Sequence, residues 1–213
     1  TADQLLAQGL ALVPKGEDYH EAYSFLLPKH YQQSVASIKK RLKSEADFTI
    51  GINIGVGKTL PYKSLSEKAE YELVLGLKEG CKGKIKVLLL GGPKDVKRAH
   101  DLKMAFRDTS LLIQESITDN MLEGAQLIGA LDLLITSDTF ALHLALAQKV
   151  PNLSWFGPTN PEEIRFGKNS EYVRSDFECS PCWSPVCDKK PRCNESEVLV
   201  NEMVAKAKKL LKA

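Results

Sequence analysis

The sequence predicts an α/β protein built on a Rossmann-like, doubly wound parallel sheet. From about Phe48 onward, short apolar segments typical of strands alternate with longer segments of helical periodicity. Several strand-like segments end in glycine, and sheets of this class bind ligands beyond the carboxyl ends of their strands. The alternation predicts parallel strands joined by crossover helices, with helices on both faces of the sheet.

Five segments have the length and composition of buried strands. Apolar side chains dominate each of them, and each is too short to be a typical helix. They span residues 48–55, 85–90, 111–113, 131–136 and 152–156.

The helix expected after the first strand has recognisable ends. Ser64 and Glu67 have the spacing of a capping box, in which the serine accepts a hydrogen bond from an early backbone N–H. Gly80 is the expected C-cap. An apolar stripe at spacing four predicts the buried face of this helix: Leu65, Ala69, Leu73 and Leu77. Further helices are expected over residues 95–106, 121–130, 139–148 and 195–213.

Residues 1–47 differ from the rest of the chain, because they contain two helical patterns and no strand signal. The patterns are separated at residues 14–18 and broken again near Pro28. This part is expected to form a helical extension or linker that packs on a main domain over residues 48–213. The chain starts at Thr1 and not at methionine, so we expect a processed or truncated product.

The composition is that of an ordinary globular protein. The chain has 213 residues, of which 43% are hydrophobic and 26% charged, with a formal net charge of +2. This near balance of charge argues against a dedicated nucleic-acid binder, and no apolar run approaches the roughly 20 residues that span a bilayer. Five cysteines and no recognisable signal peptide favour a reducing compartment, so we expect a cytoplasmic protein.

The first candidate site runs from Ser137 to His143, where a strand ends and a helix begins. Asp138 is expected to cap the helix, and Thr139 to lie in its first turn. Free N–H groups and the positive end of the helix dipole would make an anion pocket there. His143, four residues after Thr139, would donate a hydrogen bond to a phosphate from the same helix face. The alternative is a capped helix with a half-buried histidine.

The second candidate site is the loop over residues 53–63. Gly55 and Gly57 would let the backbone approach a ligand closely, while Lys58 and Lys63 bring positive charge to the same loop. The loop contains a Gly-Lys-Thr sequence, but Ile52 stands where a Walker loop requires its first glycine. The alternative is a glycine turn with surface lysines.

The third candidate site covers residues 91–95. Gly92 allows a tight turn, and the carboxylate of Asp95 just past a strand end is suited to accept hydrogen bonds from ribose hydroxyls. The alternative is a turn in which Asp95 caps the following helix.

Four of the five cysteines form a cluster within a Cys-rich segment over residues 179–193. They are Cys179, Cys182, Cys187 and Cys193. Four thiols at these spacings suit a tetrahedral zinc ion, although only the first pair has the spacing of a typical zinc hook. Free thiols and one or two disulfides are the alternatives. No Asp-x-Asp motif of metal-dependent glycosyltransferases is present.

Several of these motifs, taken in order, resemble glycosyltransferase family 9, which contains the bacterial lipopolysaccharide heptosyltransferases. Residues 137–145 and 156–161 resemble the family's Asp-Thr-Gly, histidine and Phe-Gly-Pro-Thr-x-Pro signature. Residues 51–57, with Pro61 and Lys63, are similar to its Gly-Leu-Asn-x-Gly-Ala-Gly stretch, which leads to Lys-x-Trp-Pro. The Gly-Gly-Pro of residues 91–93 and the paired cysteines of residues 179–182 also fit. The resemblance covers roughly residues 48 to 205.

The resemblance implies a two-domain GT-B fold whose C-terminal half binds a nucleotide-activated sugar, ADP-heptose in the heptosyltransferases. This chain would be that half. Lys63 and the helix start at Asp138 and Thr139 would hold the diphosphate, with His143 beside them and Asp95 near the ribose. Lysine and helix N–H groups would stabilise the phosphate charge that develops as the glycosidic bond breaks, so no metal cofactor is expected. The same donor site would include Gly55, Gly57, Lys58 and Gly92.

The implied acceptor is a lipid A–core precursor, reached at the cytoplasmic face of the inner membrane, and no nucleic-acid partner is expected. The catalytic base belongs to the family's N-terminal half, which has no counterpart here, so this chain alone would bind donor and transfer nothing. Phe140 stands where the family has glycine, and Ser64–Ser66 replace a Trp-Pro pair. Two alternatives are a non-catalytic binding or assembly module that kept the fold, and a zinc-stabilised interaction domain.

Overall fold

The fold is a single six-stranded sheet whose neighbouring strands are all parallel. A computed structural model describes residues 28–107 and 109–212. The strand order is β3-β2-β1-β4-β5-β6, which is the order of a doubly wound nucleotide-binding sheet. The strands are β1 Phe48–Asn53, β2 Ile85–Gly91, β3 Leu112–Ile117, β4 Leu133–Ser137, β5 Asn152–Phe156 and β6 Ser170–Arg174. The predicted Rossmann-like α/β class is confirmed.

Alternate residues along the central strands face two separate hydrophobic cores. On β2, Val87 and Leu89 belong to one core, while Leu88 and Leu90 belong to the other. All four are almost fully buried. Strands of a parallel sheet that is covered on both faces are apolar on both sides, and this explains why apolar residues predominate in the strand segments, with few polar ones among them.

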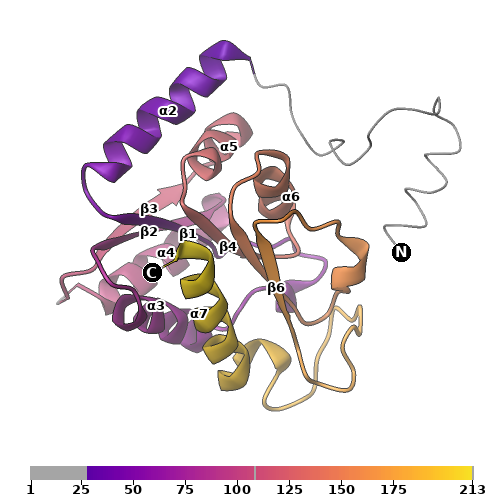
Figure 1. Cartoon of the computed structure of the whole chain (residues 1–213). Helices are drawn as coiled ribbons and strands as arrows, with labels where there is room; N and C mark the ends of the chain where they lie inside the picture. Colours follow the sequence, from indigo (N-terminus) through magenta and orange to yellow (C-terminus); the bar gives the residue numbers. More distant parts are fainter. Residues whose placement is uncertain (1–27, 108, 213) are drawn as a thin grey trace, which may run out of the picture.

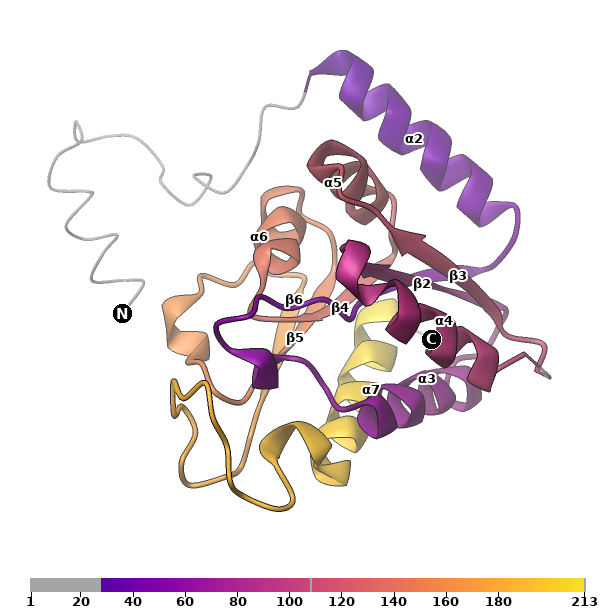
Figure 2. The ribbon, with the colours of Figure 1, turned by 180° about the vertical axis from the view of Figure 1, so that it is seen from behind.

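In the part of the chain that the structure describes, three helices cover each face of the sheet. On one face lie α3 Glu67–Gly80, α4 Val96–Ala105 and α7 Glu197–Leu211. On the other lie α2 Lys29–Lys43, α5 Met121–Gly129 and α6 Phe140–Ala147. Figure 1 and the reverse view in Figure 2 show α3 beside α7 on one side of the sheet and α2 beside α5 on the other. No helix among the described residues is long and apolar enough to cross a membrane.

The expected N-terminal extension is represented by α2. This helix contributes Leu42 to the core between α2 and α5, and its Tyr31 hydroxyl donates a hydrogen bond to Gln148 Oε1 at 3.0 Å. The first of the two helical patterns expected within residues 1–47 lies outside the described residues.

The helix predicted after β1 is correctly placed, but both of its predicted caps are wrong. Ser66 is the N-cap of α3 and accepts a hydrogen bond from Ala69 N, whereas the Ser64 hydroxyl donates to Ile54 O. Gly80 is the last helical residue, and Cys81 follows it as the C-cap in an extended conformation. The predicted stripe is confirmed, since all four of its residues are buried: Leu65, Ala69, Leu73 and Leu77.

Other boundaries differ by a few residues, and one strand was not predicted. β3 is longer than the expected 111–113, and its side chains are mostly half-buried, because it is an edge strand with one neighbour. β6 at the opposite edge has a single buried residue, Val173, so it lacks the apolar run by which the other strands were recognised. Within residues 28–107 and 109–212 there are also four short 3-10 helices: η2 Pro61–Lys63, η3 Pro93–Asp95, η4 Pro161–Glu163 and η5 Cys193–Glu195.

A buried ion pair joins α3, α4 and the segment that follows η2. Arg98 Nε donates to Glu70 Oε2 at 2.9 Å, and its Nη2 lies 2.8 Å from Glu70 Oε1. The same guanidinium donates to Leu65 O. Burial raises the pKa of Glu70 to about 8, and the positive charge of Arg98 opposes this rise. Arg98 therefore holds two helices and the chain just after Lys63 in one arrangement.

Candidate functional site

A large cavity lies where the strand order reverses. β1 and β4 are neighbours, but β1 continues into η2 while β4 continues into α6. Chains that diverge in this way leave a crevice beyond the carboxyl ends of the two strands. The switch-point cavity found there has a volume of about 870 Å³, which is within the size range of cofactor sites. All three candidate sites of the sequence contribute residues to its lining.

Lys63 connects the loop after β1 to the start of α6. It is the last residue of η2, and its Nζ lies 2.7 Å from Asp138 Oδ2 and 2.8 Å from Asp138 O. The two side chains are only 20% and 18% exposed. A half-buried ammonium is therefore held at the mouth of the helix, where it can exchange its carboxylate partner for a phosphate oxygen.

The prediction that Asp138 caps α6 is wrong, because its carboxylate turns to Lys63. Thr139 is the N-cap residue, with an extended backbone and no side-chain capping bond. Its hydroxyl instead lies 2.9 Å from Thr136 Oγ1 and accepts from Asn53 Nδ2 at 3.2 Å. The first backbone N–H groups of a helix have no intrahelical acceptor, so the start of α6 presents donors to the cavity.

Asn53 fixes the relative position of the two loops. Its Nδ2 also donates to Gly55 O at 3.0 Å and to Thr136 Oγ1 at 3.2 Å. One amide from β1 thus contacts the glycine loop, the end of β4 and, through Thr139, the start of α6. Asn53 was not among the predicted donor residues, although its position explains its role: an amide at the end of a strand in a glycine-rich loop is a candidate for positioning a site.

Asp95 closes its own turn against the cavity floor. Its Oδ2 accepts from Gly92 N at 2.9 Å, and the residue is 8% exposed. Asp95 is the N-cap residue of α4, as the alternative for the third candidate site predicts, but its side chain makes no capping bond to that helix and instead closes the preceding turn. Asp95 and Gly92 both line the switch-point cavity, so a ribose hydroxyl would have to reach the remaining carboxylate lone pairs.

Replacing Gly55 with alanine is expected to destabilise this floor. A Cβ at Gly55 would lie 2.6 Å from Asp95 Oδ2 and 3.3 Å from Gly91 Cα, so the carboxylate would have to leave the Gly92 N–H. Overpacking of this kind costs about 1–3 kcal/mol, which urea denaturation would measure. Gly57→Ala is the matched control, because a Cβ there meets nothing within 4 Å. Equal effects of the two substitutions would contradict this account.

The remaining predicted residues divide into two groups. His143 and Phe140 line the cavity from the first turn of α6, and the Phe140 ring is 56% exposed. Lys58, in contrast, is exposed and is not part of the lining. Lys94, which was not among the predicted donor residues, lines the cavity and donates to Val56 O.

A further wall of the cavity was not predicted. It comes from the end of β3 and the start of α5, and includes Thr118, Asn120, Met121, Gly124 and Ile128. Asn120 caps α5 through bonds to Leu122 N and Glu123 N. These residues carry no recognisable ligand motif, so only the parallel arrangement of β2 and β3 reveals that they belong to the site.

The four clustered cysteines line a separate small cavity together with Tyr62, Gly157 and Pro158. All four thiols are free. Burial raises the pKa of Cys193 to about 11, and the other three thiols add to this rise. A thiol with a raised pKa is a poor nucleophile. As the side chains stand, no group of three or more His, Cys, Asp or Glu residues in 28–107 and 109–212 is arranged to hold a metal ion.

Known proteins with the same fold share this arrangement of strands. The structure of ADP-heptose lipopolysaccharide heptosyltransferase II from E. coli aligns with a TM-score of 0.68 and 16% identity. The alignment covers 94% of this chain and 56% of that one. At this identity the comparison shows the fold alone, and the fold of this chain is similar to about half of that structure.

Sequence comparisons identify relatives of the same kind. Lipopolysaccharide heptosyltransferase 1 of Pseudomonas aeruginosa is 31% identical over 102 residues, which are 47% of this chain and 28% of that protein. Lipooligosaccharide heptosyltransferase 2 of Campylobacter jejuni is 32% identical over 89 residues, which are 41% of this chain and 28% of that protein. This chain therefore matches less than a third of the length of either relative.

A family model decides the assignment. The model of glycosyltransferase family 9 (heptosyltransferase) matches residues 19–192, which include the glycine loop, the switch-point cavity and most of the Cys-rich segment. The chain belongs to glycosyltransferase family 9, the heptosyltransferase family.

Proposed function

We propose that this chain is the donor-binding part of a glycosyltransferase that transfers heptose from ADP-heptose to a lipopolysaccharide core acceptor. The observation that carries the proposal is the meeting of Lys63 with the start of α6 at the switch-point cavity. An ammonium and free helix N–H groups directed at one point favour a diphosphate. The names of the relatives support heptose as the sugar.

The cavity suits each part of such a donor. The diphosphate would lie between Lys63 and the N-terminus of α6, with His143 one turn along the helix. The ribose would lie near Asp95, on the floor made by the turn after β2. The apolar side chains of Ile128 and Leu144 line the same cavity and would accommodate a flat base.

The chemistry that these groups would supply is electrostatic. Negative charge accumulates on the departing diphosphate as the glycosidic bond breaks. Preorganised donors directed at that charge stabilise the transition state without reorganising during the reaction. We expect Lys63 and the α6 N–H groups to act in this way, with no resident metal cofactor.

The acceptor and the catalytic base would come from another part of the protein. Because this chain matches only a fraction of its relatives' length, we expect the isolated chain to bind donor and to transfer nothing. The complete protein would act on lipid A–core precursors at the cytoplasmic face of the inner membrane, bound peripherally.

One observation favours a second candidate, a binding or assembly module that has lost donor affinity. The bulky ring of Phe140 occupies the first position of α6, beside the donors that would contact a diphosphate. In the family signature, glycine stands at this position.

Calorimetric titration with ADP and ADP-heptose distinguishes the two candidates. A donor site predicts dissociation constants in the micromolar to millimolar range. Phe140→Gly is expected to tighten ADP binding several-fold, because removal of the ring opens the start of α6. AMP is the control ligand, since it lacks the second phosphate and should bind more weakly. If neither the wild type nor Phe140→Gly binds ADP, the donor-binding proposal fails and the assembly module is favoured.

A further inference from the structure

The chain between β6 and η5 lacks the usual means of holding a fixed conformation. Residues 175–192 contain no helix or strand, and Ser175 is the only buried residue among them. The large apolar side chains Trp183 and Val186 are 47% and 64% exposed. Ordering the backbone costs roughly 1–2 kcal/mol per residue, and irregular segments of this length are uncommon in compact domains. A cross-link of some kind would offset that cost.

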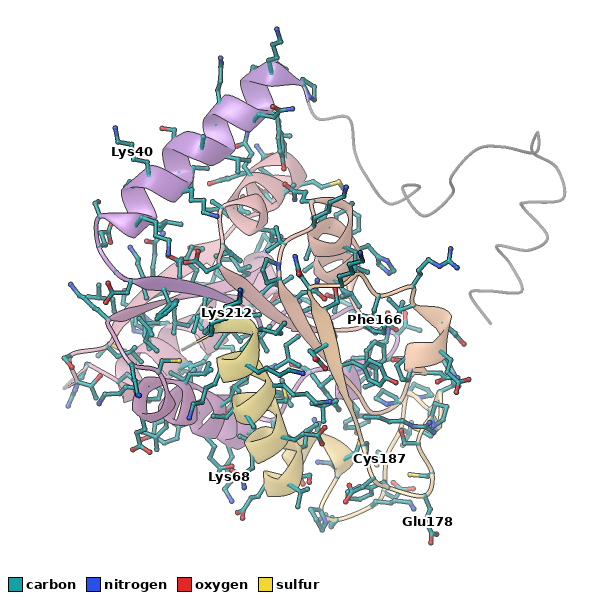
Figure 3. The ribbon with its side chains drawn as sticks, in the orientation of Figure 1. Lys40, Lys68, Phe166, Glu178, Cys187 and Lys212 are labelled. Carbon is teal, nitrogen blue, oxygen red and sulfur yellow. The ribbon has the colours of Figure 1, made fainter. Side chains whose placement is uncertain are left out.

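The four clustered thiols line one small cavity. Cys179, Cys182 and Cys187 lie in this irregular segment and Cys193 begins η5, yet all four line the same cavity of about 20 Å³. A space of this size holds one atom about as large as a water oxygen. The fifth cysteine, Cys81, follows α3 and belongs to the hydrophobic core. Figure 3 shows Cys187 on the loop at the lower edge of the molecule, near Glu178.

The backbone around this cavity is anchored to the main domain on both sides. Ser180 Oγ donates to Gly157 O at 2.6 Å, and Trp183 N donates to Pro158 O at 2.8 Å. At the other end, Asn194 Nδ2 donates to Ser64 O at 2.8 Å. These bonds hold the backbone on both sides of the cavity, so side-chain rotation decides how closely the four sulfur atoms approach one another.

We propose that Cys179, Cys182, Cys187 and Cys193 bind one zinc ion as a tetrahedral tetrathiolate that staples this segment. Thiolate sulfur is the preferred soft ligand of zinc, at about 2.3 Å from the metal. The present thiol positions are not those of a closed site, so binding requires rotation about the Cα–Cβ bonds towards the cavity. Each thiol releases its proton to solvent as its Zn–S bond forms.

Basic and acidic side chains balance along this segment. Four thiolates and one Zn²⁺ carry two negative charges, and residues 175–193 contain three basic side chains (Lys189, Lys190, Arg192) and three acidic ones (Asp176, Glu178, Asp188). Lys189 lines the thiol cavity, and the Arg192 guanidinium lies 5.2 Å from the ring centroid of Tyr62, which lines the same cavity. The zinc site does not depend on the proposed donor-binding function, since it shares no residue with the switch-point cavity.

Metal analysis of the reduced, tag-free protein tests this proposal. After incubation with zinc and removal of the unbound ion, we expect about one zinc per chain by mass spectrometry of the metal content. Replacing zinc with Co²⁺ should give sulfur-to-cobalt charge-transfer absorption and the visible bands of tetrahedral cobalt. Removal of the ion with a strong chelator should lower the melting temperature, because the ion binds the folded state alone.

Cysteine variants provide the controls. Cys182→Ser and Cys187→Ser should each lose most of the bound zinc and the cobalt spectrum, whereas Cys81→Ala should keep both. The proposal is overturned if the reduced wild type binds no zinc, or if the two cluster variants bind as much as the wild type. The proposal is also overturned if the freshly isolated protein contains disulfides among these four cysteines and binds no zinc after they have been reduced.

Discussion

Replacing Lys63 with alanine is expected to lower the affinity for ADP about 100-fold, or roughly 2.7 kcal/mol. Two effects act in the same direction. The diphosphate loses a charge-assisted hydrogen bond, worth about 1.5–3 kcal/mol. The Asp138 carboxylate, 18% exposed and 2.7 Å from the lysine in the wild type, also loses its partner and would repel the incoming anion. Calorimetric titration with ADP measures the sum.

Lys58→Ala is the matched control for this experiment. Lys58 carries the same charge on the same loop, but it is exposed and does not line the cavity. Its removal should change ADP affinity by no more than a few-fold, and that change should disappear at high salt, because exposed charges are screened. If Lys58→Ala weakened binding as much as Lys63→Ala, the positioning of Lys63 by Asp138 would have no special role.

Replacing Arg98 with methionine is expected to lower the free energy of unfolding by about 3 kcal/mol at pH 8 to 9. Removing one partner of a buried ion pair costs about 3–5 kcal/mol, because the other charge is left without compensation. We take the lower end of this range because the Arg98 side chain is 24% exposed, while Glu70 is 3% exposed. Methionine keeps most of the apolar stem of arginine, so the loss reports on the charge and on the bond to Leu65 O.

The size of this loss should depend on pH. Burial raises the pKa of Glu70 to about 8 from an ordinary value of 4.5, so protonation favours the folded state. That stabilisation is present below pH 4.5 and is lost as the pH rises through 8. Arg98 lowers the pKa of Glu70, so its removal raises that pKa further. At pH 6 the carboxyl is neutral with or without Arg98 and the substitution costs less, whereas at pH 9 the wild-type carboxylate is ionised and paired and the variant loses this stabilised charge.

Urea denaturation at pH 6 and pH 9 measures this dependence. Lys97→Met is the control on the same helix, since Lys97 is 88% exposed and pairs with the exposed Asp101. A surface pair of this kind is worth a few tenths of a kcal/mol. A loss in Arg98→Met that does not change between the two pH values would contradict the assigned role of Glu70.

The sequence was sufficient to predict the central strands of the sheet, because buried strands are rich in apolar residues. β1, β2, β4 and β5 are covered on both faces, so nearly every position is buried and most of the buried residues are apolar, which can be recognised without knowledge of the neighbouring strands. The edge strands β3 and β6 have one neighbouring strand each and mix polar with apolar residues. This is why β3 was predicted too short and β6 was not predicted.

Caps were harder to place than the helices they end. Ser64, Ser66 and Asp138 are all chemically capable of capping, so composition does not decide among them. Ser64 is drawn to Ile54 O and Asp138 to Lys63, which leaves Ser66 and Thr139 as the N-cap residues of α3 and α6. Each choice depends on a partner brought in from another part of the chain.

By itself the sequence determined the fold class, the family and three of the loops that form the switch-point cavity. These follow from residues close together in the chain, where glycine, lysine and strand ends lie within one motif. Only the tertiary structure decided which side chains meet. Parallel strand pairing brought Lys63 to Asp138 over 75 residues, placed Asn53 against Thr136 and Thr139, and added the wall from β3 and α5. The physical reason is that contacts across a parallel sheet join segments separated by whole crossover helices, so local sequence patterns do not record them.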